Sequence, residues 1–174
     1  MQPIFTIGHS TRSAEELIGL LGAHEVNCLA DVRTVPRSRR NPQFNRETLP
    51  ETLREAGIDY VHMRGLGGFR RPRPDSVNAA WRNESFRGYA DYMQTQEFDE
   101  HLEALLARAA TERIAIMCAE AVPWRCHRSL IADALLVRGI EVFEIIDAKH
   151  VQPHELTKFA KVEGTRVTYP AGSS

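Results

Sequence analysis

The twelve residues 117–128 gather many of the side chains that proteins use for chemistry. The stretch reads MCAEAVPWRCHR and holds two of the three cysteines of the chain, with a histidine, a carboxylate and two arginines. Cysteine and histidine supply nucleophiles, proton carriers and metal ligands, whereas arginine binds phosphate or carboxylate through paired N–H groups. The stretch is therefore a candidate catalytic loop or metal site, or simply the turn between a buried strand and a helix.

A thiol mechanism is one interpretation. Cys118 ends an apolar run and Arg125 precedes a predicted helix, as in phosphatase or rhodanese-like sites where a cysteine attacks an anion held by an arginine and a helix N-terminus. Six residues separate Cys118 from Arg125, one more than in the protein tyrosine phosphatase loop. Glu120 lies between them and would repel an anion. Both features count against this interpretation.

Metal binding is a second interpretation, in which Cys118, Cys126, His127 and His9 would supply four tetrahedral ligands. Adjacent helical residues point about 100° apart, so Cys126 and His127 do not aim easily at one ion. The stretch also lacks a Cys-x-x-Cys pair. We predict no metal site and identify no cofactor. Cys126 is expected to pack as a small apolar side chain, because apolar residues follow it at helical spacing.

The rest of the sequence predicts the elements that position this stretch. Apolar runs typical of strands cover residues 4–8, 26–32, 58–62, 113–118 and 140–146. Helical patterns lie between them, at residues 13–22, 48–56, 86–93, 98–109 and 124–138. This alternation predicts an α/β fold, a Rossmann-like three-layer sandwich with a mainly parallel five-stranded sheet.

The remaining sequence features bound the class of protein. With 174 residues and 43% hydrophobic content, residues 1–174 are expected to form a single domain, with a core at 3–150 and a less regular extension at 151–174. In the extension we expect a short helix at 153–160 and an additional edge strand at 165–169. No apolar run approaches the ~20 residues needed to cross a bilayer. Three cysteines and a start without signal-peptide character predict a cytoplasmic protein with reduced thiols.

Polar residues follow the predicted strands where each strand ends. The carboxyl ends of parallel strands meet at one rim of a sheet, which is where α/β proteins bind ligands. The residues expected at this rim are His9, Ser10, Asp31, Arg33, Gly67, Gly68, Cys118 and Glu120, followed by Arg125, Cys126, His127 and Arg128.

These residue types suggest roles at the rim. Glu120 is the expected general base, with His9 as the alternative and Cys118 as a candidate nucleophile. Asp31 would orient His9 or a substrate hydroxyl, while Arg33 and Arg128 would bind an anion. The other rim residues are expected to contact the ligand. The glycine pair alone is a weak signal, because it also fits a simple turn.

Four separated blocks resemble domain-of-unknown-function family 488. They are Thr6-Ile-Gly-His-Ser10, Asp31-Val-Arg33, Leu66-Gly-Gly68 and Cys118-x-Glu120-x-x-Pro123-x-x-Cys126-His-Arg128. The resemblance implies a small bacterial or archaeal α/β protein and supports the site positions. It implies no reaction.

The charge distribution adds two expectations about partners. Between Arg33 and Arg87 the chain has twelve arginines, no lysine and six acidic residues, although the net charge of the whole chain is −1. This excess favours a small anionic ligand, such as a phosphorylated or nucleotide-like substrate. The alternative is a nucleic-acid-binding module that uses the Arg-rich loops 36–40 and 69–73, with aromatic residues interleaved.

Overall fold

The structure is a computed structural model that describes residues 2–172. Across these residues a six-stranded sheet has the order β3-β2-β4-β1-β5-β6. Its strands are β1 (Ile4–Gly8), β2 (Cys28–Asp31), β3 (Asp59–His62), β4 (Ile114–Cys118), β5 (Val142–Ile145) and β6 (Val151–Pro153). The first five are parallel, and β6 pairs antiparallel with β5. The predicted α/β sandwich with a mainly parallel sheet is confirmed.

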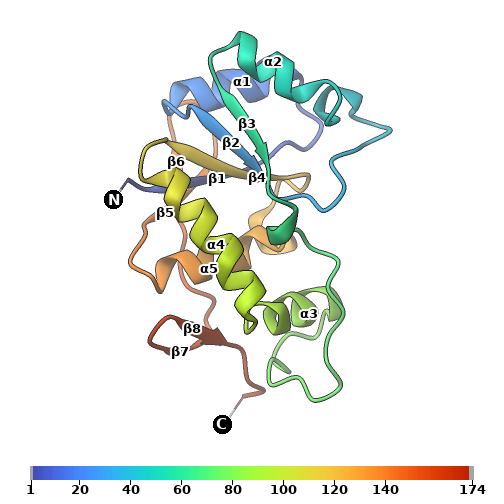
Figure 1. The fold of residues 1–174 in the computed structure, drawn as a ribbon, viewed down its shortest axis with the longest axis vertical. Coiled ribbons are helices and arrows are strands. Elements are labelled where there is room, and N and C mark those ends of the chain that lie inside the picture. The colour runs from blue at the N-terminus through green and yellow to red at the C-terminus, as the bar shows by residue number, and fades with distance from the viewer. Residues whose placement is uncertain (1, 173–174) are drawn as a thin grey trace.

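Helices cover both faces of the sheet (Figure 1). They are α1 (Ala14–Ala23), α2 (Leu49–Glu55), α3 (Glu84–Tyr92), α4 (Gln96–Ala109) and α5 (Arg128–Leu136). One core packs α1 and α2 against the sheet, and a larger core packs α3, α4 and α5 against the other face. Because both faces are covered, β1, β2 and β4 are buried at every residue, as strands of a parallel sheet are.

Local chemistry explains where α1 begins. Ser13 accepts a hydrogen bond from the backbone N–H of Glu16, and the Glu16 carboxylate accepts one from the backbone N–H of Ser13. This reciprocal cap stabilises the first turn directly after the loop that leaves β1. The loop between β1 and α1 is thereby fixed at its helical end.

The loop after β4 differs from its prediction. The helix predicted at 124–138 begins only at Arg128, because Pro123–Arg125 forms a short 3₁₀ turn and Cys126 is extended. The part of the chain that the structure describes has two other 3₁₀ turns, at Pro42–Phe44 and Arg64–Leu66. The late start of α5 lengthens the loop at the carboxyl end of β4.

The helix predicted at 153–160 is wrong. β6 and an irregular segment occupy this part of the chain. The buried carboxylate of Asp133 accepts hydrogen bonds from His154 Nε2 and from the backbone N–H and hydroxyl of Thr157. Such side-chain bonds replace the hydrogen bonds that a helix would form.

The strand predicted at 165–169 is present as β8 (Arg166–Thr168). It pairs with β7 (Lys161–Glu163) in a two-stranded antiparallel hairpin, separate from the central sheet (Figure 1). Tyr169 follows β8 and donates a hydrogen bond from its hydroxyl to Asp133, 2.7 Å away. Asp133 therefore ties the end of the chain to α5.

Within residues 2–172, no helix has the length and apolar character needed to cross a membrane.

Candidate functional site

A cavity of about 380 Å³ lies at the carboxyl ends of β1, β2 and β4. Its wall includes eight of the residues predicted from the sequence: His9, Arg33, Gly68, Cys118, Glu120, Arg125, Cys126 and His127. The sheet order explains this gathering, because β4 lies between β2 and β1 although it comes far later in the chain. The volume is in the range of small-molecule sites.

Four predicted residues lie outside the lining of this cavity: Ser10, Asp31, Gly67 and Arg128. Asp31, Gly67 and Arg128 are buried. A Cβ on Gly67 would lie 2.4 Å from Thr34 Oγ1, so this glycine permits a close approach of two loops. Asp31 and Arg128 are engaged with internal partners.

The loops after β1 and β4 are joined at the cavity. The backbone N–H of His9 donates to the carbonyl of Cys118 over 2.9 Å, and that of Ser10 donates to Ala119 over 2.9 Å. These bonds extend the parallel pairing beyond the register partners Gly8 and Cys118. The position of His9 is therefore coupled to the loop that carries Cys118.

Arg33 is held in place by an internal network. Asp31 accepts two side-chain hydrogen bonds from Arg33, at 2.9 Å from Nε and 2.7 Å from Nη2. Nη2 of Arg33 also donates to the carbonyl of Phe44, and the Tyr60 hydroxyl donates to Asp31 over 2.5 Å. The Arg33 side chain is only 7% exposed. Because its charge is balanced by Asp31, Arg33 contributes little free positive charge to the cavity.

His9 is a neutral imidazole with both nitrogens engaged. Nδ1 donates to the carbonyl of Ser10 over 2.8 Å, and Nε2 accepts from Nη1 of Arg33 over 3.3 Å. Burial is the main cause that lowers the pKa of His9, and the nearby charge of Arg33 lowers it further. The ring also stacks on Phe44, with centroids 4.3 Å apart. This geometry positions His9 as part of the cavity wall and leaves no free nitrogen for proton transfer.

Arg128 lies beneath the loop that follows β4. Its side chain is fully buried and forms an ion pair with Glu144 of β5, at 2.7 Å. Nε donates to Thr6 Oγ1 over 2.9 Å, while Nη1 donates to Cys118 Sγ over 2.7 Å and to the carbonyl of Glu120. Arg128 thus holds the loop after β4 and the Cys118 thiol in place.

The two cysteines of the cavity have opposite protonation preferences. Burial alone would raise the pKa of Cys118, but a hydrogen bond with Cys126 and the charge of Arg128 outweigh it, and the pKa is lowered. The pKa of Cys126 is raised, because it is hydrogen-bonded to Cys118 and also buried. Two coupled thiols share their titration, so the arrangement favours a thiolate at Cys118 and a thiol at Cys126.

His127 closes the wall beside Cys126. Nε2 donates to the carbonyl of Val32 over 2.9 Å, which leaves Nδ1 as the acceptor 3.5 Å from Cys126 Sγ. Burial lowers the pKa of His127 to about 4. Gly68 packs against this ring, since a Cβ there would lie 3.3 Å from Nδ1. His127 is therefore neutral near pH 7.

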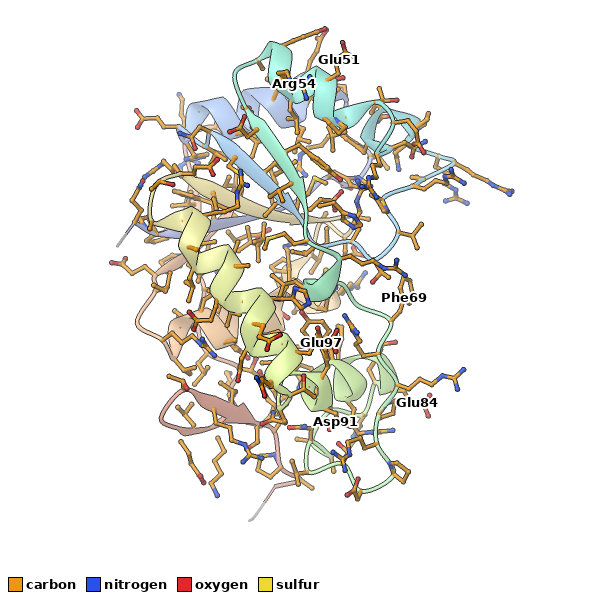
Figure 2. All side chains as sticks on the ribbon, viewed as in Figure 1. Glu51, Arg54, Phe69, Glu84, Asp91 and Glu97 are labelled. Atoms are coloured by element: carbon orange, nitrogen blue, oxygen red, sulfur yellow. The ribbon has the colours of Figure 1, made fainter. Side chains whose placement is uncertain are left out.

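Sequence reasoning did not place several further residues in the wall: Thr34, Val35, Arg37, Ser38, Phe69, Ser85, Phe86 and Ala119. Arg37, Ser38 and Phe69 belong to the Arg-rich loops that the sequence did mark. Phe69 is 84% exposed and has a φ of 59°, a backbone conformation that is rare outside glycine. It lies at the edge of the molecule, on the segment between β3 and α3 (Figure 2). Its position after Gly67-Gly68 was the available signal.

The structure does not bring together the ligands of a metal site. Among residues 2–172, no group of three or more His, Cys, Asp or Glu side chains is arranged to hold a metal ion. His9 and His127 each use a ring nitrogen for a backbone carbonyl.

Comparison with known proteins identifies the family. No curated protein and no solved structure matches the chain. A family model described as "Domain of unknown function DUF488" matches residues 13–135, a segment that contains β2, β4 and most of the cavity wall. The chain therefore belongs to the DUF488 family.

Proposed function

We propose that the protein binds a small anionic ligand, of a phosphorylated or nucleotide-like kind, in the cavity at the rim of the sheet. The observation that carries the proposal is the presence of two exposed arginines, Arg37 and Arg125, on the cavity wall. Among the described residues Arg125 forms no salt bridge, and Arg37 has only a 3.4 Å contact with Glu47 on the exposed surface. An exposed pair of this kind contributes little, so Arg37 is readily released to a ligand.

This proposal changes the expected roles of the arginines. Arg33 and Arg128 are buried and neutralised by Asp31 and Glu144, so they shape the site. Arg125 and Arg37 take over the role of binding the anion. Guanidinium groups suit this task because they bind phosphate through two parallel N–H donors.

The other walls suit the remainder of a nucleotide-like ligand. Phe69 and Phe86 provide aromatic surface on the side of the cavity formed by the segment before α3 and by α3 itself. Glu120 is exposed at the cavity. We propose that its carboxylate accepts a hydrogen bond from a substrate hydroxyl, or takes a proton from it. Aromatic rings stack on bases, and carboxylates accept hydrogen bonds from sugar hydroxyls.

Thermal shift assays with AMP and with ribose 5-phosphate test this proposal. We expect both to raise the melting temperature of the wild-type protein. Arg125→Ala should weaken AMP binding by about tenfold to a hundredfold, because one charge-assisted hydrogen bond contributes roughly 1.5–3 kcal/mol. Arg39→Ala is the matched control, since Arg39 is an exposed arginine of the same region that does not line the cavity.

Two results would overturn the proposal. One is stabilisation by neither ligand, and the other is equal stabilisation of the wild type, Arg125→Ala and Arg39→Ala. The nucleic-acid alternative is tested with a single-stranded oligonucleotide at two salt concentrations. Tighter binding of the oligonucleotide than of AMP, with a steep salt dependence and loss in Arg39→Ala, would replace the small-ligand proposal.

A further inference from the structure

The sulfur atoms of Cys118 and Cys126 both accept hydrogen bonds from the buried Arg128. Nη1 of Arg128 donates to Cys118 Sγ over 2.7 Å, and the backbone N–H of Arg128 donates to Cys126 Sγ over 3.5 Å. A hydrogen bond from the Cys126 thiol to Cys118 is among the causes that lower the pKa of Cys118 and raise that of Cys126. A residue at the end of β4 and a residue just before α5 are thus brought within reach of one another.

Both cysteines line the same cavity. Cys118 and Cys126 are 3% and 7% exposed, and both belong to the wall of the rim cavity. A small molecule in the cavity therefore lies next to both residues. Neither thiol is needed for the anion binding proposed above.

The environment of Cys126 keeps its proton in place. Nδ1 of His127 lies 3.5 Å from Cys126 Sγ and carries no proton, because Nε2 donates to Val32, so the ring places no cation beside this sulfur. The Cys126 thiol is also hydrogen-bonded to Cys118. Cys118 receives the cationic donor instead, since Nη1 of Arg128 points at its sulfur. Cys118 is thus placed to attack as a thiolate, and Cys126 stays protonated until the second step.

The third cysteine provides a contrast inside the same chain. Cys28 is fully buried in β2 and lies 3.7 Å from Nη2 of Arg108. Burial raises its pKa to about 12. It is outside the cavity wall and has no second sulfur beside it among the hydrogen-bond partners described. Cys28 is therefore an internal control for an inert thiol.

We propose that Cys118 and Cys126 form a reactive dithiol that reduces small disulfides entering the rim cavity. The Cys118 thiolate attacks one sulfur of the substrate R–S–S–R, a bond forms between Cys118 and that sulfur, and RS⁻ leaves with the electron pair of the broken bond. The sulfur of Cys126 then attacks Cys118 Sγ and displaces the second RS⁻. The proton of Cys126 passes to a departing thiolate, and the other is protonated by solvent.

The two steps balance. The substrate gains two electrons and becomes two thiols, while Cys118 and Cys126 lose two electrons and form a disulfide. A single turnover needs no further reactant. Repeated turnover takes two electrons from an external dithiol. Cys118 is the attacking residue because the attacking species is the thiolate, and Arg128 is the positioning residue that holds it.

A neutral chromogenic disulfide, 4,4′-dithiodipyridine, tests the inference separately from the anion proposal, because its binding does not depend on Arg37 or Arg125. The protein should carry Cys28→Ala so that only Cys118 and Cys126 can react with the probe. We expect rapid release of two equivalents of thiopyridone per protein, and peptide mapping should find a Cys118–Cys126 disulfide. Circular dichroism and melting temperature establish that each variant is folded.

The single variants assign the roles. Cys126→Ser should release only one equivalent, faster than Cys118→Ser reacts, and keep one pyridyl adduct on Cys118. Cys118→Ser should react at least tenfold more slowly. Three results would each overturn the inference: two adducts on the wild type without an internal disulfide, equal rates for the two variants, or reaction of the cavity thiols only after denaturation.

Discussion

A Cβ atom on Gly8 would lie 1.8 Å from the carbonyl oxygen of Glu120. This close approach lets the chain after β1 run against the loop that carries Cys118, with the backbone of His9 bonded to Cys118. No larger residue fits without moving one of the two segments. Gly8 is thus required for the packing of the loop over Arg128.

Gly8→Ala is therefore expected to be destabilising, by about 1–3 kcal/mol, because the added methyl group overpacks a backbone contact. It should also slow the reaction of Cys118 with a disulfide probe, since the loop is displaced. The control is Gly19→Ala, on an exposed position of α1 where a Cβ meets nothing within 4 Å. That change should stabilise the protein by roughly 0.5–1 kcal/mol. Urea unfolding measures both; equal effects of the two substitutions would contradict the role given to Gly8.

The pH dependence of alkylation should distinguish Cys118 from the other thiols. The lowered pKa of Cys118 keeps a thiolate at pH values where an ordinary thiol is protonated, so its reaction with iodoacetamide should persist to lower pH than that of an ordinary thiol. The thiolate fraction rises with pH, and the midpoint of the profile reports the pKa. Mass spectrometry of peptides measures each site. Cys28, whose pKa is raised to about 12, should stay unmodified in the folded protein.

A matched pair of variants tests the contribution of Cys126 to this profile. Cys126→Ser retains an O–H donor for the Cys118 thiolate, whereas Cys126→Ala removes the donor. The midpoint for Cys118 should move to higher pH in Cys126→Ala and less so in Cys126→Ser. If neither variant moves the midpoint, the hydrogen bond between the two cysteines does not stabilise the thiolate.

Much of the sheet and of the rim could be predicted from the sequence because the signals are local. β4 is a continuous apolar run that ends in Cys118, and the alternation of strands and helices defines a parallel sheet. In a parallel sheet the strand ends must share one rim. The meeting of Cys118 and His9 at one cavity follows from these two facts.

The roles of the arginines could not be predicted in the same way, because charge pairing depends on which strands are neighbours. Arg128 is buried against Glu144, which lies on β5 on the far side of β1 from β4. A carboxylate within an apolar strand such as Val142–Ile145 is the signal that points to such a pair. The sequence did not predict the start of α5 because helical periodicity continues through Cys126, whereas the backbone there is extended and its sulfur accepts a hydrogen bond from the N–H of Arg128.

Stability should fall with decreasing pH through the titration of His127. Its pKa is about 4 in the folded protein and close to 6.5 when unfolded, so above pH 7 both states are neutral. Between these values the unfolded state binds a proton that the folded state does not. The free energy of unfolding should therefore decrease from about pH 7 to pH 4, by up to about 3 kcal/mol.

His127→Gln should flatten this part of the profile, because the amide can still donate to Val32 but does not titrate. His150→Gln is the control, since His150 is 72% exposed and lies in a turn next to Asp147. Urea unfolding at a series of pH values gives the difference between variants and wild type. A His127→Gln profile parallel to that of the wild type would show that burial of this ring does not govern the acid limb.

We expect Phe69 to lower the stability of the protein and to contribute to ligand binding. Its φ of 59° is unfavourable for a residue with a side chain, at a cost of about 1–2 kcal/mol, and its ring gains little burial because it is 84% exposed. Phe69→Gly should therefore raise the free energy of unfolding by about 1 kcal/mol. Glu25→Gly, at an exposed position with a φ of 60°, should give a similar gain.

The two variants should differ in ligand binding. Phe69→Gly removes an aromatic side chain from the cavity wall and should weaken the binding of AMP by about tenfold. Its affinity for ribose 5-phosphate should be unchanged, because this ligand has no base to stack. Glu25→Gly should leave both affinities as in the wild type. Equal AMP affinity in the two variants would show that the strained backbone at Phe69 serves the packing of the loop and not a stacked base.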